Sequence, residues 1–283
     1  MSSPRPRSRT HRAQKNLIWE EQTPSSGLYF RVKRWLHRER SSFQLIEVIE
    51  NETYGRVLLL DGLVQTTEAD EFFYHEMLVQ PALHCHPEPE KVLIIGGGDG
   101  GALREVLKHP VKKVIMVDID ERVVEIARKF FSWLEPCLRD SRVEIVFADG
   151  HEYVATTREK FDVILVDSSD PVGPSEVLHR QDFFLKLKSI LRPRGIIAAQ
   201  SGSAFFHRQS IQEKRRFLET MFRYAHFYLG PVPTYPGGLW CYVFLSDRIN
   251  PLRGPARKIV PGLKYYSQAI HRASFVLPPF LQK

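Results

Sequence analysis

Apolar and polar positions alternate over short runs in the first quarter of the chain. A period of two residues predicts strands with one buried face. The clearest runs lie at residues 28–32, 43–49 and 55–60. Asn51-Glu52-Thr53 supplies a turn between the second and third of them. We therefore expect a small antiparallel sheet between Leu17 and about Thr67, followed by a helix over residues 70–80 with Pro81 near its end.

Beyond residue 87 the rhythm changes to continuous apolar runs separated by stretches of helical spacing. The predicted strands are residues 92–95, 114–117, 143–147, 163–166 and 195–199. Strands that alternate with helices predict an α/β fold with a doubly wound, mostly parallel sheet. In such a sheet, ligands bind at the carboxyl ends of the strands. We divide the chain into a basic tail (1–15), an N-terminal β domain (16–78) and a larger α/β domain (79–283).

Net charge is concentrated in the opening segment. The chain carries a formal charge of +7, and five basic residues lie within its first 15, among Pro and Ser with no apolar periodicity. That composition predicts a disordered tail and leaves about +2 for the remainder, so we expect no specific nucleic-acid binding. No apolar run is long enough for a membrane span. Three isolated cysteines without a CxxC pair predict neither a zinc site nor disulfides, and they suit a reducing cytoplasm.

A glycine-rich loop follows the first strand of the larger domain. Gly96, Gly98 and Gly101 satisfy the GxGxxG fingerprint, which dehydrogenases and S-adenosylmethionine enzymes share. Asp99 lies inside this loop, where it would repel the pyrophosphate of a dinucleotide but suit a sulfonium or ammonium cation. A simple helix cap is the alternative role for Asp99.

Acidic residues also end the next two strands. Asp118 can accept hydrogen bonds from both ribose hydroxyls, and Asp149, next to Gly150, can accept from an adenine amino group. Carboxylates at three successive strand ends are hard to explain by packing alone. Together with Asp99 they predict a site for a nucleoside that carries a sulfonium.

A further strand ends in Asp167-Ser168-Ser169-Asp170, and a Pro- and Gly-rich segment through Pro174 continues it. Two carboxylates three residues apart in a turn can face one pocket, where they would hold a cationic amine and accept its proton. The segment suggests a loop able to close over the site. The alternative is an Asp-Pro turn in which Asp170 bonds its own backbone. The histidines form no metal-binding pattern, so we expect no metal.

These features occur together with motifs that resemble the polyamine aminopropyltransferase family. The resemblance runs from Trp19 to the C-terminus and implies a β domain on a methyltransferase-like Rossmann domain, assembled as a homodimer or homotetramer. Its most specific segments are 60–68 (LDGLVQTTE), 70–77 (DEFFYHEM), 96–101 (GGGDGG), 167–171 (DSSDP), Ala199-Gln200 and 233–238 (PTYPGG).

The resemblance also implies roles for individual residues. Asp167 would accept the proton of the amine. Those expected around the same amine are Asp170, Tyr74, Tyr235, Gln200 and, at the far end, Trp19. Those expected to hold the nucleoside and its aminopropyl arm are Gln44, His75, Gly96, Gly98, Asp99, Asp118, Asp149, Gly150 and Pro174. No cofactor is implied, because decarboxylated S-adenosylmethionine is itself a co-substrate.

The implied reaction is attack of a neutral amine on the propyl carbon beside the sulfonium, with release of 5′-methylthioadenosine. We expect putrescine as the acceptor, with Glu20 or Glu21 reaching its distal charge, while agmatine, cadaverine and spermidine remain alternatives. An S-adenosylmethionine methyltransferase is the competing enzyme, although Asp99 would disfavour the carboxylate of the intact cofactor. A polyamine-binding protein without activity and an RNA-binding module acting through the tail are the remaining alternatives.

Overall fold

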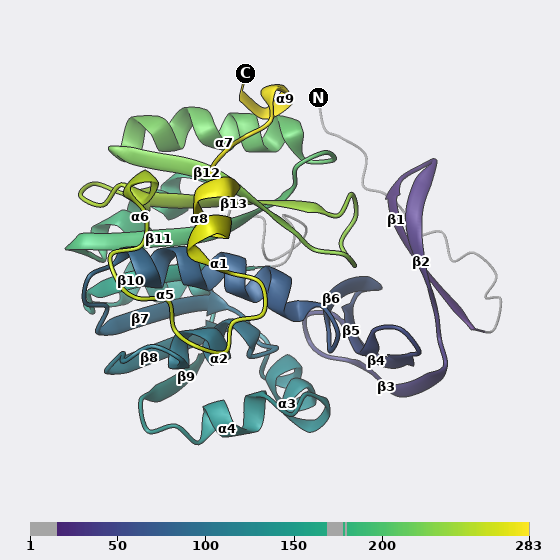
Figure 1. Ribbon diagram of the computed structural model, residues 1–283. Coiled ribbons are helices and arrows are strands. Elements are labelled where there is room, and N and C mark those ends of the chain that lie inside the picture. The colour runs from purple at the N-terminus through teal and green to yellow at the C-terminus, as the bar shows by residue number, and fades with distance from the viewer. Residues whose placement is uncertain (1–15, 169–177, 179, 283) are drawn as a thin grey trace.

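The protein consists of a small β region at the N-terminus and a larger α/β region that follows it (Figure 1). The computed structural model describes residues 16–168, 178 and 180–282. The basic tail, Asp170 and Pro174 lie outside the described residues. Our expectations for them, including a loop that closes over the site, therefore stay predictions.

The β region contains a two-stranded hairpin and a four-stranded antiparallel sheet in the order β3-β4-β5-β6. Its strands are β1 (Leu17–Thr23), β2 (Ser26–Arg31), β3 (Arg34–Arg40), β4 (Leu45–Asn51), β5 (Gly55–Leu60) and β6 (Leu63–Thr67). The antiparallel sheet expected here is confirmed. We did not delimit β1 and β3 as separate strands, because most of their residues are exposed or half-buried and the alternation is weak.

The larger region is built on a seven-stranded sheet in the order β12-β13-β11-β10-β7-β8-β9. Strands β7 to β11 run parallel, which confirms the doubly wound, mostly parallel arrangement, and β12 and β13 add an antiparallel edge that the sequence analysis did not predict. The strands are β7 (Lys91–Gly96), β8 (Lys113–Asp118), β9 (Val143–Phe147), β10 (Phe161–Asp167), β11 (Leu191–Ser203), β12 (Tyr224–Pro231) and β13 (Leu239–Ser246). After β7 the chain adds β8 and β9 on one side of β7, and then β10 and β11 on the other side. The order of strands therefore reverses between β7 and β10, and ligands bind in the crevice at such a point.

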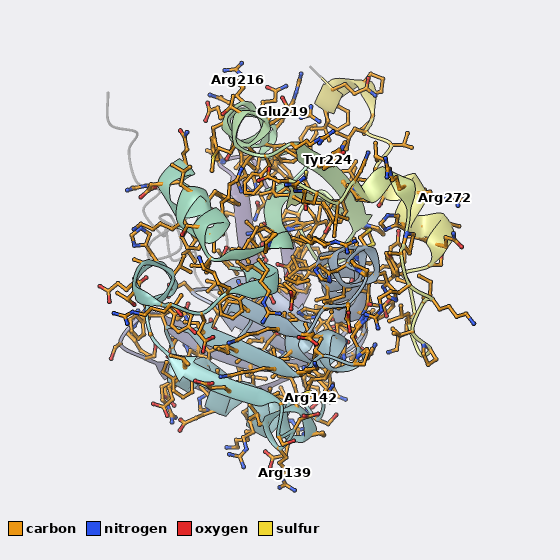
Figure 2. The ribbon with its side chains drawn as sticks, turned by 90° about the vertical axis from the view of Figure 1, so that its left-hand side faces the viewer. Arg139, Arg142, Arg216, Glu219, Tyr224 and Arg272 are labelled. Carbon is orange, nitrogen blue, oxygen red and sulfur yellow. The ribbon has the colours of Figure 1, made fainter. Side chains whose placement is uncertain are left out.

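Helices cover both faces of this sheet. One face carries α1 (Glu71–Cys85), α2 (Gly101–Leu107), α3 (Glu121–Phe130), α4 (Leu134–Leu138) and α8 (Gln268–Ser274). The other carries α5 (Gly150–Thr156), α6 (Gln181–Ser189) and α7 (Arg208–Met221). A short η2 (Pro251–Arg253) and α9 (Pro279–Gln282) complete the elements. Arg216 on α7 and Arg139 after α4 mark opposite ends of the molecule (Figure 2). Among the described residues, no helix is long and apolar enough to cross a membrane.

Helix α1 does not end near Pro81, as the sequence analysis expected, but continues to Cys85 with Pro81 inside it. A proline has no N–H for the carbonyl four residues earlier, here that of Met77. The hydroxyl of Tyr228, on β12, donates to that carbonyl at 2.9 Å. A tertiary hydrogen bond therefore replaces the missing helical one, and sequence spacing could not reveal it.

A segment near the C-terminus is fastened to the middle of α1. The buried carboxylate of Glu76 accepts hydrogen bonds from three consecutive backbone N–H groups, those of Lys264, Tyr265 and Tyr266, at 2.7–2.9 Å. Glu76 follows directly on His75, so the same helix that carries candidate site residues is braced by the end of the chain.

Candidate active site

The glycine loop lies at the carboxyl end of β7, beside the end of β10. Gly96 has a φ of +81°, and a Cβ there would lie 2.1 Å from the carbonyl oxygen of Asp167. A Cβ at Gly98 would lie 2.8 Å from Oδ2 of Asp118. Gly96 therefore requires glycine, whereas a Cβ at Gly98 would displace the carboxylate of Asp118, because the loop passes close to both strand ends.

A network of charged side chains connects the glycine loop to α1. Asp99 accepts from the backbone N–H of Gly101, the first residue of α2, at 2.9 Å, although Gly100 is the N-cap of that helix. The other oxygen of Asp99 lies 3.4 Å from Nε2 of His75. Nδ1 of His75 bonds Glu71 at 2.8 Å, and Arg104 contacts Glu71 through two N–H groups. Glu71 lies one helical turn before His75, a spacing that could have indicated this pair from the sequence.

Each charged side chain in this network stabilises the charged form of its neighbours. Burial disfavours the imidazolium of His75, but Asp99 and Glu71 outweigh that cost and raise its pKa well above the usual range. Burial also opposes ionisation of Glu71, yet bonds from His75 and Arg104 lower its pKa to about 2. Asp99 behaves likewise, since His75 lowers its pKa despite burial. His75 is therefore a buried cation held between two carboxylates.

Two strand-end acids line the remainder of the cleft. Asp118 ends β8, and burial raises its pKa to about 6. Asp149 precedes α5 and caps it, since its Oδ1 accepts from the N–H groups of His151 and Glu152 at 2.7 and 3.2 Å. Cap and ligand roles are compatible for a carboxylate, which has a second oxygen.

Asp167 ends β10 at the point where strand order reverses. Tyr74 donates its hydroxyl to Oδ1 of Asp167 at 2.8 Å. The other oxygen, Oδ2, is buried and has no hydrogen-bond partner among residues 16–168, 178 and 180–282. Burial raises the pKa of Asp167 to about 6. An oriented carboxylate with one uncommitted oxygen and a raised pKa is suited to accept a proton from a ligand.

These groups surround a main cavity of about 270 Å³. Its lining includes eleven of the predicted site residues, nine of which are Gln44, Tyr74, His75, Gly96, Gly98, Asp99, Asp118, Asp167 and Tyr235. Asp149 and Gly150 also line it, together with Gln65, which the sequence analysis did not single out. Gln65 is structurally important because its carbonyl accepts the hydroxyl of Tyr235.

A side pocket of about 40 Å³ adjoins the main cavity, and the two share Leu63, Gln65, Tyr74, Ser168 and Tyr235. The far wall of the side pocket is formed by Glu20, Val64, Gln200, Pro236 and Trp240. Gln200 donates to the carbonyl of Ser168 at 3.0 Å. This pocket joins β1, β6, α1, β11 and the segment between β12 and β13.

Trp19 does not occupy the place predicted for it. Its side chain is 59% exposed, its ring lies 5.6 Å from that of Tyr29, and it lines neither cavity. Neighbouring residues of a strand face opposite sides. Glu20, which is buried, faces the side pocket, whereas Trp19 and the exposed Glu21 face away from it. Of the two acids considered for the distal charge, the structure brings Glu20 to the pocket.

Comparison with known proteins gives consistent matches. Residues 71–252 match the family described as spermine/spermidine synthase domain, and residues 17–68 match the one described as spermidine synthase tetramerisation domain. The polyamine aminopropyltransferase of Moorella thermoacetica is 44% identical over 270 residues, covering 94% of this chain and 95% of the relative. That of Bacillus subtilis is 41% identical over 268 residues, covering 93% and 97%.

Solved structures agree with these relatives. A spermidine synthase in complex with the transition state analogue AdoDATO superposes with a TM-score of 0.91 at 39% identity, covering 95% of this chain and 94% of that one. Spermidine synthase from Thermotoga maritima gives a TM-score of 0.89 at 39% identity, covering 97% and 94%.

Proposed function

The chain belongs to the spermine/spermidine synthase family of polyamine aminopropyltransferases, and on this premise we propose that it transfers the aminopropyl group of decarboxylated S-adenosylmethionine to putrescine. The products are spermidine and 5′-methylthioadenosine. The observation that carries the proposal is the buried Oδ2 of Asp167, which has no hydrogen-bond partner among the described residues. Asp167 lines the main cavity and bonds Tyr74, which lines both the main cavity and the side pocket.

The reaction needs a base because the acceptor is protonated in solution. An alkylammonium has a pKa of about 10.4, so only about one molecule in a few thousand is neutral at pH 7, a handicap of about 4–5 kcal/mol. Asp167 takes the proton from the amine nitrogen. The nitrogen lone pair then forms a bond to the propyl carbon, the carbon–sulfur bond breaks, and its electron pair neutralises the sulfonium.

The main cavity supports the nucleoside part of this proposal. Asp118 and Asp149 both line it, and we propose that Asp118 accepts from ribose hydroxyls and that Asp149, next to Gly150, accepts from the adenine amino group. Asp99 would face the cationic aminopropyl arm, because it lines the main cavity, while Glu71, the other acid beside His75, is also paired with Arg104. The complex of the related spermidine synthase with AdoDATO supports the same assignment.

The side pocket supports a short diamine as acceptor. Tyr74, Tyr235, Trp240 and Glu20 line it, and Tyr74 donates to Asp167, which lines the adjoining main cavity. Glu20 accepts from the backbone N–H of Val64 at 3.0 Å, which fixes its position. Two carboxylates, those of Glu20 and Asp167, in or next to a small apolar-walled space fit a diamine with a charge at each end. Asp170 and Pro174 lie outside the described residues, and we propose that Asp170 contacts the amine and Pro174 the nucleoside.

A product assay tests the proposal. The purified chain is incubated with decarboxylated S-adenosylmethionine and, separately, putrescine, cadaverine, agmatine or spermidine, and 5′-methylthioadenosine and the new polyamine are quantified. We expect putrescine to give the highest kcat/KM, cadaverine to be weaker by a few-fold and spermidine to be poor. The acceptor assignment fails if agmatine or spermidine ranks first. Methyl transfer from intact S-adenosylmethionine would contradict the reaction itself.

We also propose that the enzyme is a homotetramer in a reducing, cytoplasmic compartment. The match of residues 17–68 to a tetramerisation domain supports the first point, as does the projecting β1–β2 hairpin, which exposes Trp19 and Tyr29 (Figure 1). The free thiols of Cys85, Cys137 and Cys241 support the second. Light scattering measures the molar mass of the wild type and of a Trp19→Ser, Tyr29→Ser double variant. If the double variant has the mass of the wild-type assembly, the hairpin does not form the subunit interface.

A further inference from the structure

A buried carboxylate beside the main cavity forms hydrogen bonds with both regions of the molecule. Asp120 lies between β8 and α3 and is 2% exposed. It does not line the main cavity, but its neighbours Asp118 and Ile119 do. Its backbone N–H donates to Oδ1 of Asp118 at 2.9 Å. Asp120 therefore does not line the main cavity itself, but it bonds Asp118, which does.

The side chain of Asp120 reaches across to the β region. Its Oδ2 accepts from Ser41 Oγ at 2.6 Å and from Gln44 Nε2 at 3.0 Å, while Oδ1 caps α3 by accepting from the N–H of Arg122 at 3.1 Å. The hydroxyl of Ser41 in turn accepts from the backbone N–H of Gln44 at 3.1 Å. Both the backbone and the side chain of Gln44 are therefore held through this carboxylate.

The charge of Asp120 also decides which way the amide of Gln44 points. An ionised carboxylate only accepts hydrogen bonds, so the NH₂ group of Gln44 must face it. The carbonyl oxygen of Gln44 is then turned away from Asp120. Because Gln44 lines the main cavity, that oxygen is available to a donor on a ligand, such as a hydroxyl or an ammonium.

We propose that Asp120 is a positioning residue for nucleoside binding, which fixes the side chain of Gln44 as a hydrogen-bond acceptor and thereby couples the β region to the main cavity. A bidentate ion pair between Arg122 and Glu39, at 2.7 and 2.9 Å, reinforces the same junction from the surface. This inference rests on the proposed function, and it concerns the donor half of the reaction alone.

Calorimetry with 5′-methylthioadenosine tests the role without requiring turnover. Asp120→Ala is expected to raise the dissociation constant about tenfold and to raise the KM of the aminopropyl donor similarly, with the KM of the amine unchanged. In a Gln44→Ala background the same substitution should cost less than about twofold, because the group that it positions is gone. Equal losses in both backgrounds, or a parallel loss of amine affinity, would overturn the proposal.

Two further variants separate positioning from folding. Asp120→Asn keeps the shape, but its amide cannot both cap α3 and accept from Gln44 and Ser41, so it should reproduce the loss of affinity if the alanine variant does not fold. Ser267→Ala removes the cap of α8, where Ser267 Oγ accepts from the N–H of Ile270. This control should lower the melting temperature without changing nucleoside affinity. Failure of the wild type to bind 5′-methylthioadenosine would instead refute the proposed function.

Discussion

The main cavity and the side pocket are built in different ways. The main cavity takes four of its carboxylates, Asp99, Asp118, Asp149 and Asp167, from the ends of the parallel strands β7, β8, β9 and β10, which follow each other along the chain. The side pocket is assembled from β1, β6, α1, Ser168 after β10, β11, β13 and the segment before β13, which are far apart in sequence. One half of the site is therefore a property of the fold class, whereas the other depends on how distant segments pack.

The two halves also differ in how their carboxylates are balanced. Asp99 has His75 as a buried counter-charge, whereas Asp167 has a neutral hydroxyl from Tyr74 and one oxygen without a described partner. Paired charges favour binding, and a poorly solvated, unpaired carboxylate favours proton transfer. We infer that the main cavity holds the donor and that the junction with the side pocket does the chemistry.

The largest expected effect comes from removing the proton acceptor. Asp167→Asn keeps the shape of the side chain but can neither take a proton nor balance an ammonium, so kcat should fall about 1000-fold. Affinity for 5′-methylthioadenosine should change less than about threefold. Both are measured on one preparation, with Asp182→Asn on the exposed side of α6 as the matched control. Turnover like that of the wild type would exclude Asp167 from the mechanism.

A smaller effect is expected in the choice of donor. Asp99 should make the main cavity prefer decarboxylated over intact S-adenosylmethionine by at least ~100-fold, because an unpaired like charge in a closed pocket costs several kcal/mol. Competitive calorimetry with both compounds measures the ratio, and Asp99→Asn should reduce it. Equal affinities in the wild type would favour a methyltransferase-like site.

The pH dependence should separate the halves further. Burial raises the pKa of Asp167 to about 6, so below this pH the carboxyl is protonated and cannot act as the base. The kcat/KM for the amine should therefore fall about tenfold per pH unit below 6. Nucleoside affinity should fall only a few-fold, although the pKa of Asp118 is also about 6, because a protonated carboxyl still forms hydrogen bonds. A rate profile without a change of slope near pH 6 would contradict this.

Glu20 offers a test confined to the side pocket. Glu20→Gln retains the acceptor for the N–H of Val64 but removes the charge, so kcat/KM for putrescine should fall about tenfold. Propylamine, which has no second charge, should be unaffected. Glu21→Gln on the exposed face of β1 is the control. An equal loss with both amines would mean that Glu20 acts on packing alone.

The smallest effect is expected outside both halves. Deleting residues 1–15 should leave activity and melting temperature nearly unchanged, because that stretch has no apolar residues after Met1 other than Ala13 to anchor it. Steady-state kinetics and thermal unfolding of the truncated chain provide the measurement. A marked fall in either quantity would show that the tail contacts the folded body.

Sequence patterns were informative where chemistry is local. The glycine loop, Asp99, Asp118, Asp149 and Asp167 follow directly on apolar runs, so their place at one edge of a parallel sheet could be predicted. The antiparallel edge formed by β12 and β13 could not, because a mostly buried strand has no alternation to reveal its direction. The length of α1 depended on a hydroxyl from Tyr228, which has no signature near Pro81.

Groups that act through another residue were the ones that sequence reasoning missed. Asp120 looks like an ordinary helix cap until the β region is docked against it, and Glu71 belongs to a motif that the sequence analysis quoted without giving it a role. The family resemblance implied that Trp19 would lie at the far end of the amine, yet a strand turns alternate residues to opposite faces, and here Glu20 lines the side pocket. The sequence pattern does not show which face of β1 points inward, because residues on both of its faces are partly exposed.

The bond between Glu76 and the backbone of residues 264–266 has a consequence for biosynthesis. The ribosome makes α1, with Tyr74 and His75, long before it makes the segment that occupies the carboxylate of Glu76. Until then that carboxylate lacks these three donors, and α1, which carries Tyr74, lacks its contact with residues 264–266. We expect a nascent chain stalled before Lys264 to be inactive, so that activity appears only after the C-terminal segment has been translated.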